Sequence, residues 1–158
     1  MKWHLSHPVH GNKPRAVQAE GMKRAAGHKK FGQFLEQGLG KTALDLNEFI
    51  DCGETEINIV VAPNSFVGDW VMAPAEWGVP WLKTGLRRRD PMPGNHEQYM
   101  LYAVNYELVR EKEYNRSLQK LMEYRPCKLT IDESTAIKNP GTSTFKAVME
   151  LTKRAKVV

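Results

Sequence analysis

The chain has 158 residues, 41% of them hydrophobic, so it is long enough to bury one sizeable core and too short for two full lobes. Its net charge of +5 and pI near 9.2 favour an anionic partner, with nucleic acid as the leading candidate. It contains no apolar run of about 18 residues and no Cys-x-x-Cys pair, so we expect a soluble, cytoplasmic protein with no membrane partner, disulfide framework or zinc site.

The first half of the chain alternates predicted helices with predicted strands. A helix begins at Pro14 and ends before Gly27, and a second, with an apolar face, runs from Thr42 to Gly53. A strand is expected over 31–35, between these helices. The apolar, β-branched run Ile57–Ala62 is typical of a strand buried on both faces of a parallel sheet.

The second half continues the alternation after Pro63. Ser65 is expected to cap a helix whose Trp70 and Trp77 share a face and pack in the core, and a loop follows over 78–96. The remaining expected elements are a strand over 99–104, a helix over 111–124, a strand over 128–131, a helix from Thr142 or Ser143 to Leu151, and the start of a strand over 156–158. This order predicts an α/β fold with a mainly parallel sheet flanked by helices, and ligands at the carboxyl ends of its strands.

Two short segments predict chemistry. Gly38-Leu39-Gly40-Lys41-Thr42 opens a helix, and it offers inward-facing backbone N–H groups, a mobile cation for outer phosphates and a hydroxyl for a metal ion. Asp132 and Glu133 place two carboxylates at the end of a predicted apolar strand. Because the carboxyl ends of parallel strands share an edge, the fold should bring Lys41 and Asp132, 132 − 41 = 91 residues apart, to one nucleoside triphosphate site.

Other interpretations of these residues stay open. The glycines can serve a simple turn, and an acidic pair at a strand exit can merely cap a loop. An unrelated phosphate-loop kinase or transferase would also carry such a loop. His4, His7 and His10 do not predict a metal site, because Pro8 and Gly11 break the helix that would align them.

The basic residues form clusters along the chain. Any one cluster can be a solvated surface, because an exposed lysine is stable in water without a partner, so only their sum supports an anionic ligand. The clusters are Lys23-Arg24, Lys29-Lys30, Arg87-Arg88-Arg89 and Lys153-Arg154-Ala155-Lys156.

In series, these motifs resemble the first RecA-like lobe of superfamily 2 helicases, a P-loop NTPase lobe, and in particular Swi/Snf-type DNA translocases. The resemblance covers nearly all of the chain from Lys13 onward. The matching segments are Lys13–Gly21 (the glutamine motif), Glu36–Thr42 (the phosphate loop), Val60–Trp70 (a strand ending in Pro-x-Ser before a Trp-bearing helix), Asn105–Glu107 (the tyrosine-containing motif) and Asp132–Pro140 (the Asp-Glu box with its trailing Ile-Lys-Asn).

The resemblance implies ATP and Mg²⁺ as cofactors and assigns roles to matching residues. Gln18 would bind adenine, Gly38 to Thr42 would hold the phosphates with Lys41 as their cation, and Thr42 and Asp132 would hold Mg²⁺. Glu133 would orient or deprotonate the attacking water, and Ser65 and Tyr106 would touch the DNA backbone. As alternatives, Gln18 is an ordinary surface glutamine and Tyr106 a ring at the core edge.

Departures from the family pattern limit these expectations. No histidine follows as the fourth residue of the acidic box, which puts coupling of hydrolysis to DNA motion in doubt. Leu35 stands where the general phosphate-loop pattern begins with Gly or Ala, but the Swi/Snf family also lacks that residue, so Leu35 favours the family over a generic nucleotide kinase. We expect residues 1–12 to be an N-terminal extension and 13–158 to be the helicase ATP-binding domain, ending where the family continues into Thr-Gly-Thr-Pro and a second lobe.

The expected function is therefore that of an ATP-binding lobe of a DNA-dependent helicase or translocase. A second RecA-like lobe, on another chain or on a further part of this one, would supply arginines for catalysis. Without those arginines the lobe should bind Mg-ATP and hydrolyse it poorly. The alternative is a stand-alone module without motor activity that binds nucleic acid, duplex or single-stranded, or a partner helicase.

Overall fold

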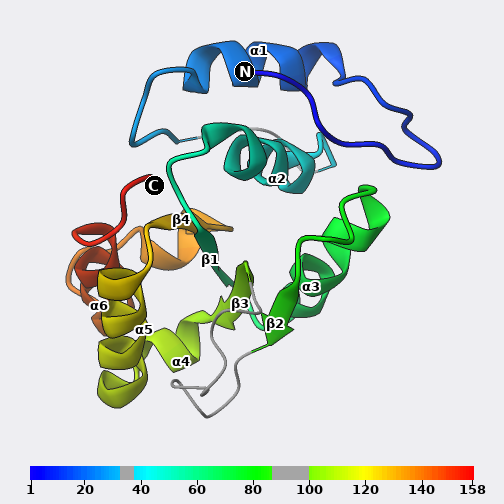
Figure 1. Cartoon of the computed structure of the whole chain (residues 1–158). Helices are drawn as coiled ribbons and strands as arrows, with labels where there is room; N and C mark the ends of the chain where they lie inside the picture. The colour runs from blue at the N-terminus through cyan, green and yellow to red at the C-terminus, as the bar shows by residue number, and fades with distance from the viewer. Residues whose placement is uncertain (33–37, 87–99) are drawn as a thin grey trace.

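A computed structural model describes residues 1–32, 38–86 and 100–158 (Figure 1). Within these residues a parallel sheet has the strand order β2-β3-β1-β4. The strands are β1 (Ile57–Ala62), β2 (Thr84–Leu86), β3 (Leu101–Asn105) and β4 (Cys127–Ile131). The helices are α1 (Ala16–Ala25), α2 (Lys41–Cys52), α3 (Val67–Glu76), α4 (Tyr106–Arg110), α5 (Lys112–Tyr124) and α6 (Ser143–Thr152), with a 3-10 helix, η2, at Ser134–Ile137. The predicted α/β fold with a parallel sheet is confirmed.

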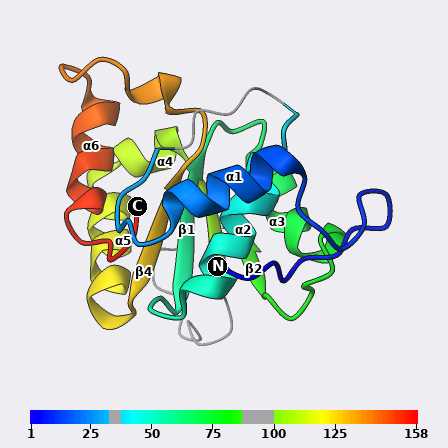
Figure 2. The ribbon, with the colours of Figure 1, turned by 90° about the horizontal axis from the view of Figure 1, so that it is seen from above.

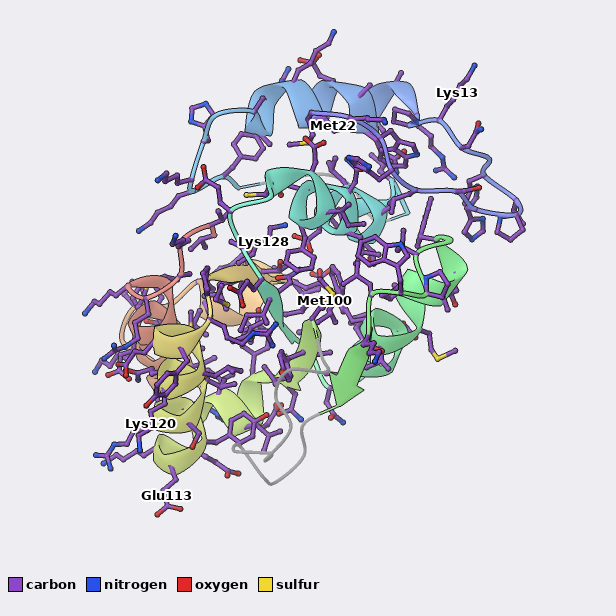
Figure 3. The ribbon with its side chains drawn as sticks, viewed as in Figure 1. Lys13, Met22, Met100, Glu113, Lys120 and Lys128 are labelled. Carbon is purple, nitrogen blue, oxygen red and sulfur yellow. The ribbon has the colours of Figure 1, made fainter. Side chains whose placement is uncertain are left out.

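Helices cover both faces of the sheet (Figure 1). One face packs against α4, α5 and α6 through a core that includes Ile59, Val104 and Leu118. The other packs against α2 and α3 through a core that includes Leu46 and Trp70. Helix α1 lies across the outer side of α2 (Figure 2), and Met22 points from it toward α2 (Figure 3). Strand β1, buried along its whole length, lies between the two cores as its composition predicts.

Backbone pairing extends the sheet beyond β4. Val157 forms a parallel bridge with Lys128, where the sequence predicts the start of a strand. The N–H of Val158 donates to the carbonyl of Lys29, and the N–H of Phe31 donates to the carbonyl of Val158, both over 2.9 Å. Residues 29–31 therefore lie beside the sheet. Most of the strand predicted over 31–35 falls on 33–37, outside the described residues.

Local sequence signals set most element boundaries. Helix α2 ends at Gly53, whose φ of 61° places it in the left-handed region that glycine tolerates best. Helix α6 begins after Thr142, whose hydroxyl accepts a hydrogen bond from the backbone N–H of Phe145, as predicted. The expected N-terminal extension packs onto the domain, because Leu5 is buried and the N–H of His4 donates to Asn47 of α2.

Two local predictions are wrong, and two short elements are not predicted. Ser65 does not cap α3; its N-cap residue is Phe66, with no side-chain hydrogen bond. Strand β2 falls within the segment predicted as a loop, and α4 and η2 are not predicted. These elements have three to five residues each, too few for a periodic pattern to develop.

Across the described parts of the chain, no helix is long and apolar enough to cross a membrane.

Candidate functional site

The predicted phosphate loop and the predicted acidic pair meet at the carboxyl edge of the sheet. Lys41 is the first residue of α2, and Glu133 follows β4 by two residues. The ammonium nitrogen of Lys41 lies 3.9 Å from a carboxylate oxygen of Glu133, and both side chains are about one-third exposed, at 32% and 38%. Lys41 and Asp132 also line one cavity of about 430 Å³. The convergence expected from the parallel topology is therefore present.

Gly38 and Gly40 shape the described part of the phosphate loop. Their φ angles of 81° and 80° lie in the left-handed region, where a residue with a Cβ is strained. At Gly40 a Cβ would also stand 2.3 Å from the amide nitrogen of Gln18. Gly40 is the N-cap residue of α2, and its carbonyl accepts the hydrogen bond from the N–H of Leu44. Residues 35–37 of the predicted loop are outside the described residues.

Gln18 contacts the phosphate loop from α1. Its side chain is 2% exposed, its carbonyl oxygen accepts a hydrogen bond from the N–H of Arg15 at 2.8 Å, and its amide nitrogen donates to the carbonyl of Gly40 at 3.3 Å. Both ends of the amide are thus engaged within the chain. Adenine recognition by Gln18 requires these bonds to be exchanged for contacts with the base, whereas support of the loop requires no rearrangement.

Asp132 is held in place by four hydrogen bonds, one of which its backbone N–H donates to the carbonyl of Val61 at 2.9 Å. One carboxylate oxygen accepts from the indole N–H of Trp70 at 2.9 Å, and the other accepts from the backbone N–H of Glu133 at 3.0 Å. The backbone carbonyl of Asp132 accepts from the hydroxyl of Tyr106 at 2.6 Å. The orientation of the carboxylate is therefore fixed from α3. The sequence predicts only core packing for Trp70, because no local pattern specifies a partner 62 residues away.

Tyr106 lies under the acidic pair rather than on the surface. The residue is 5% exposed and its hydroxyl donates to the backbone carbonyl of Asp132, so the contact between Tyr106 and the DNA backbone, which stays a prediction, would require this hydrogen bond to be exchanged. Burial, together with the charges of Asp132 and Glu133, raises the pKa of the Tyr106 hydroxyl well above its ordinary value. The hydroxyl therefore stays protonated and remains a hydrogen-bond donor.

Glu133 has a strained backbone. Its φ of 51° and ψ of 58° place it in the left-handed region, the only non-glycine residue there in the described part of the chain. Such a conformation costs of the order of 1 kcal/mol or more, and it is found most often at functional sites. It turns the chain sharply from β4 into η2, and its side chain reaches toward Lys41.

The predicted DNA-contacting residue Ser65 is exposed, in the turn that follows β1. The preceding residue, Asn64, accepts a hydrogen bond through its side-chain oxygen from the amide of Asn105, the last residue of β3, at 2.9 Å. Asn105 also caps α4 by accepting from the N–H of Leu108. The turns after β1 and β3 are thus joined at the edge that carries Lys41 and Glu133. The Arg87-Arg88-Arg89 cluster lies outside the described residues.

A buried ionic network, not predicted from the sequence, joins α2 to β4 and lines the same cavity as Lys41 and Asp132; its cation, Lys128, is labelled in Figure 3. The ammonium of Lys128 contacts one carboxylate oxygen of Asp45 and lies 3.0 Å from one of Glu48. Asp45 also accepts hydrogen bonds from the amide of Asn58 at 3.0 Å and the hydroxyl of Thr130 at 2.8 Å. Burial alone would lower the pKa of Lys128, but the two carboxylates raise it above its ordinary value, so the lysine is charged.

The chemistry of the edge fits a magnesium ion carried by a triphosphate. No group of three or more His, Cys, Asp or Glu side chains capable of holding a metal ion occurs among residues 1–32, 38–86 and 100–158. Mg²⁺ bound with phosphates needs only one or two protein oxygens, because phosphate and water oxygens complete its shell. Asp132 offers a carboxylate with free lone pairs, and Thr42, in the first turn of α2, offers a hydroxyl.

Comparison with known proteins identifies the fold. No protein-family model and no curated protein matches the sequence. Among solved structures, the Sulfolobus solfataricus SWI2/SNF2 ATPase core in complex with dsDNA superimposes with a TM-score of 0.66 and 22% identity, over 95% of this chain and 32% of that one. The SWI2/SNF2 ATPase core domain of the same organism gives a TM-score of 0.67 and 24% identity, over 95% and 30%.

The chain thus spans about a third of the length of these solved structures. At this level of identity, the similarity concerns the fold. This chain has the α/β RecA-like fold of a SWI2/SNF2 ATPase core.

Proposed function

We propose that this chain is an ATP-binding lobe of a DNA-dependent ATPase. One observation carries the proposal: Lys41 and Glu133 meet at 3.9 Å at the carboxyl edge of a parallel sheet, where ligands of such folds bind. The RecA-like fold and the order of the motifs support it. The two solved structures compared above are SWI2/SNF2 ATPase cores, and one of them is in complex with dsDNA.

Each residue at the edge has a role in this proposal that follows from its chemistry. The N–H groups of the Gly38-to-Thr42 turn and the ammonium of Lys41 bind the phosphates, since a helix N-terminus and a mobile cation both attract anions. Thr42 and Asp132 hold Mg²⁺, which neutralises charge on the phosphates when bound. The hydrogen bond from Trp70 fixes the orientation of the Asp132 carboxylate, as expected of a group that supports a metal ligand.

Glu133 is the residue proposed to act on water. Its carboxylate is partly exposed, so a water molecule can reach it, and its proximity to Lys41 sets it beside the proposed phosphate site. Orienting the water and accepting its proton both require an ionised carboxylate. A carboxamide of the same shape would retain the packing and lose this function.

Efficient turnover in this proposal needs arginines from a second RecA-like lobe. Such a residue stabilises charge on the transferring phosphoryl group and contributes about 10³ to 10⁵ in rate. The 158-residue chain by itself should therefore bind Mg-ATP and hydrolyse it slowly, with DNA as the activating partner.

The decisive variant is Glu133→Gln, compared with Glu113→Gln on the exposed side of α5 (Figure 3). We expect Glu133→Gln to bind Mg-ATP within about twofold of the parent affinity and to lose single-turnover hydrolysis in the presence of DNA, while Glu113→Gln retains both. Hydrolysis by Glu133→Gln at the parent rate would remove Glu133 from the mechanism. Absence of Mg-ATP binding by the parent chain would overturn the proposed function and favour a nucleic-acid binding module.

A further inference from the structure

A second hollow lies on the opposite face of the sheet from α2. It has a volume of about 780 Å³ and is bounded by α4, α5 and α6, which pack on the core that contains Val104 and Leu118. We call it the α5–α6 groove. The residues of the proposed ATP site do not line it. Its basic side chains are Arg110, Lys112, Arg116, Lys146, Lys153 and Arg154.

These cations come from three separate parts of the chain and are mostly unpaired. Only Arg154 is engaged, by the carboxylate of Glu123 and the side-chain oxygen of Gln119. The other five have no ion pair or side-chain hydrogen bond with any residue that the structure describes, and all are exposed. Glu150 is the only carboxylate among the groove's lining residues. This concentration of like charge is unfavourable for the chain alone and favourable for binding an anion.

The floor of the groove is ordered by two side-chain amides, those of Asn115 and Gln119. Asn115, 3% exposed, donates to the carbonyls of Val109 and Ala147, at 3.0 and 3.1 Å, which ties α5 to α4 and to α6. Its side-chain oxygen accepts from the amide of Gln119 at 2.6 Å, and Gln119 in turn accepts from Arg154 at 2.8 Å. The two walls are therefore held at a fixed separation, so the cations project from a rigid support rather than from a mobile loop.

The dimensions of the groove fit a chain of phosphates. Helix α6, of ten residues, rises about 15 Å, and one strand of B-DNA presents about four phosphates over that length at 3.4 Å per nucleotide. Five unpaired cations match this density. The groove also leads away from the proposed ATP site, because α4 starts at Tyr106, whose hydroxyl bonds Asp132, and ends at Arg110 in the groove.

From these observations we propose that the α5–α6 groove is a binding site for the phosphodiester backbone of a nucleic acid. The site is distinct from the turns at the carboxyl edge that carry Ser65 and Asn105. Phosphates are contacted by the flexible ammonium groups of Lys112, Lys146 and Lys153 and by the guanidinium groups of Arg110 and Arg116. These contacts read no base sequence, so the groove fixes the position of the nucleic acid without selecting its sequence.

The test measures the salt dependence of DNA binding without ATP, so it does not depend on the ATP site. Fluorescence anisotropy of labelled duplex and single-stranded oligonucleotides is recorded from low to physiological salt for the parent chain and for Lys146→Gln/Lys153→Gln. The matched control is Lys23→Gln/Lys120→Gln, which removes two exposed lysines that lie outside the groove; Lys120 is labelled in Figure 3. Thermal denaturation of each variant checks that it is folded.

For duplex DNA, the groove variant should lower the slope of log K against log salt by about 1.8, because two phosphate contacts are lost and each contributes about 0.9. For a single strand, where each contact contributes about 0.7, the slope should fall by about 1.4. Its affinity at low salt should fall at least tenfold, with the control within about twofold of the parent. The proposal is overturned if the groove variant keeps the parent's salt slope and DNA affinity, or if the control variant loses as much DNA affinity as the groove variant. It is also overturned if polyglutamate at equal charge concentration displaces the DNA, because the groove would then be assigned to an acidic protein.

Discussion

The substitution Lys128→Met tests the idea that a buried ionic network holds α2, and with it the phosphate loop, against β4. Lys128 is 2% exposed, and its ammonium is the cation shared by the carboxylates of Asp45 and Glu48, each 12% exposed. Methionine fills similar volume without the charge. Because two buried carboxylates then lose their partner, we expect the free energy of unfolding to fall by about 3–5 kcal/mol, a large fraction of the 5–15 kcal/mol typical of a whole domain.

The assay is urea denaturation followed by tryptophan fluorescence and circular dichroism. Lys120→Met on the exposed side of α5 is the control for the same chemical change, and it should alter the free energy of unfolding by no more than about 0.5 kcal/mol. The triple variant Lys128→Met/Asp45→Asn/Glu48→Gln removes the unpaired charges as well, so it should recover much of the loss.

The pH dependence of this effect has a defined sign. The pKa of Lys128 is raised above its ordinary 10.5, so the stabilisation is fully present below that pH and is lost only as pH rises through the higher pKa of the folded state. The loss in free energy of unfolding caused by Lys128→Met should therefore be constant from about pH 7 to about pH 9. If Lys128→Met lowers the free energy of unfolding by less than about 1 kcal/mol, or by no more than Lys120→Met does, then the buried network does not hold α2 against β4.

Two further variants test the hydrogen bonds around Asp132. Trp70→Phe removes the indole N–H and should lower the affinity for Mg²⁺ in nucleotide binding about 10- to 100-fold. The assay titrates Mg²⁺ in the presence of a fluorescent ATP analogue. The control Trp81→Phe, at a 55% exposed position, should have no effect. Equal Mg²⁺ titrations for the two would argue against a positioning role for Trp70. Tyr106→Phe removes the donor to the Asp132 carbonyl and should lower the free energy of unfolding by about 0.5–1.5 kcal/mol, with unchanged DNA affinity. A loss of DNA affinity without a loss of stability would support the predicted contact between Tyr106 and DNA.

Patterns within short stretches of sequence predict most of the fold. Ile57–Ala62 has too few polar side chains to be anything but a buried strand, and Gly53 and Thr142 are common helix-ending and helix-starting residues in the positions where they act. The very short elements β2 and α4 carry no such pattern, because a hydrophobic period needs several residues to show.

The candidate site was predictable in its residues and only partly in its contacts. The convergence of Lys41 and Glu133 follows from parallel topology, which brings strand ends to one edge. The hydrogen bonds of Trp70 with Asp132 and of Gln18 with Gly40 join positions 62 and 22 residues apart, and no local rule specifies such pairs. A signal for the buried network did exist: Asp45 stands among the apolar residues of α2, and such a charge implies a buried partner.

We propose that the turn at Lys41 and the acidic pair at the end of β4 form one Mg-triphosphate site. Its most direct test is calorimetric titration of ATP, with and without Mg²⁺, into the parent chain and into Lys41→Ala, with Lys23→Ala on α1 as the control. We predict saturable, Mg²⁺-dependent binding by the parent and by Lys23→Ala, and an affinity loss of at least about 100-fold for Lys41→Ala, because charge-assisted hydrogen bonds to a phosphate are lost. Equal affinity of Lys41→Ala and the parent would contradict the claim.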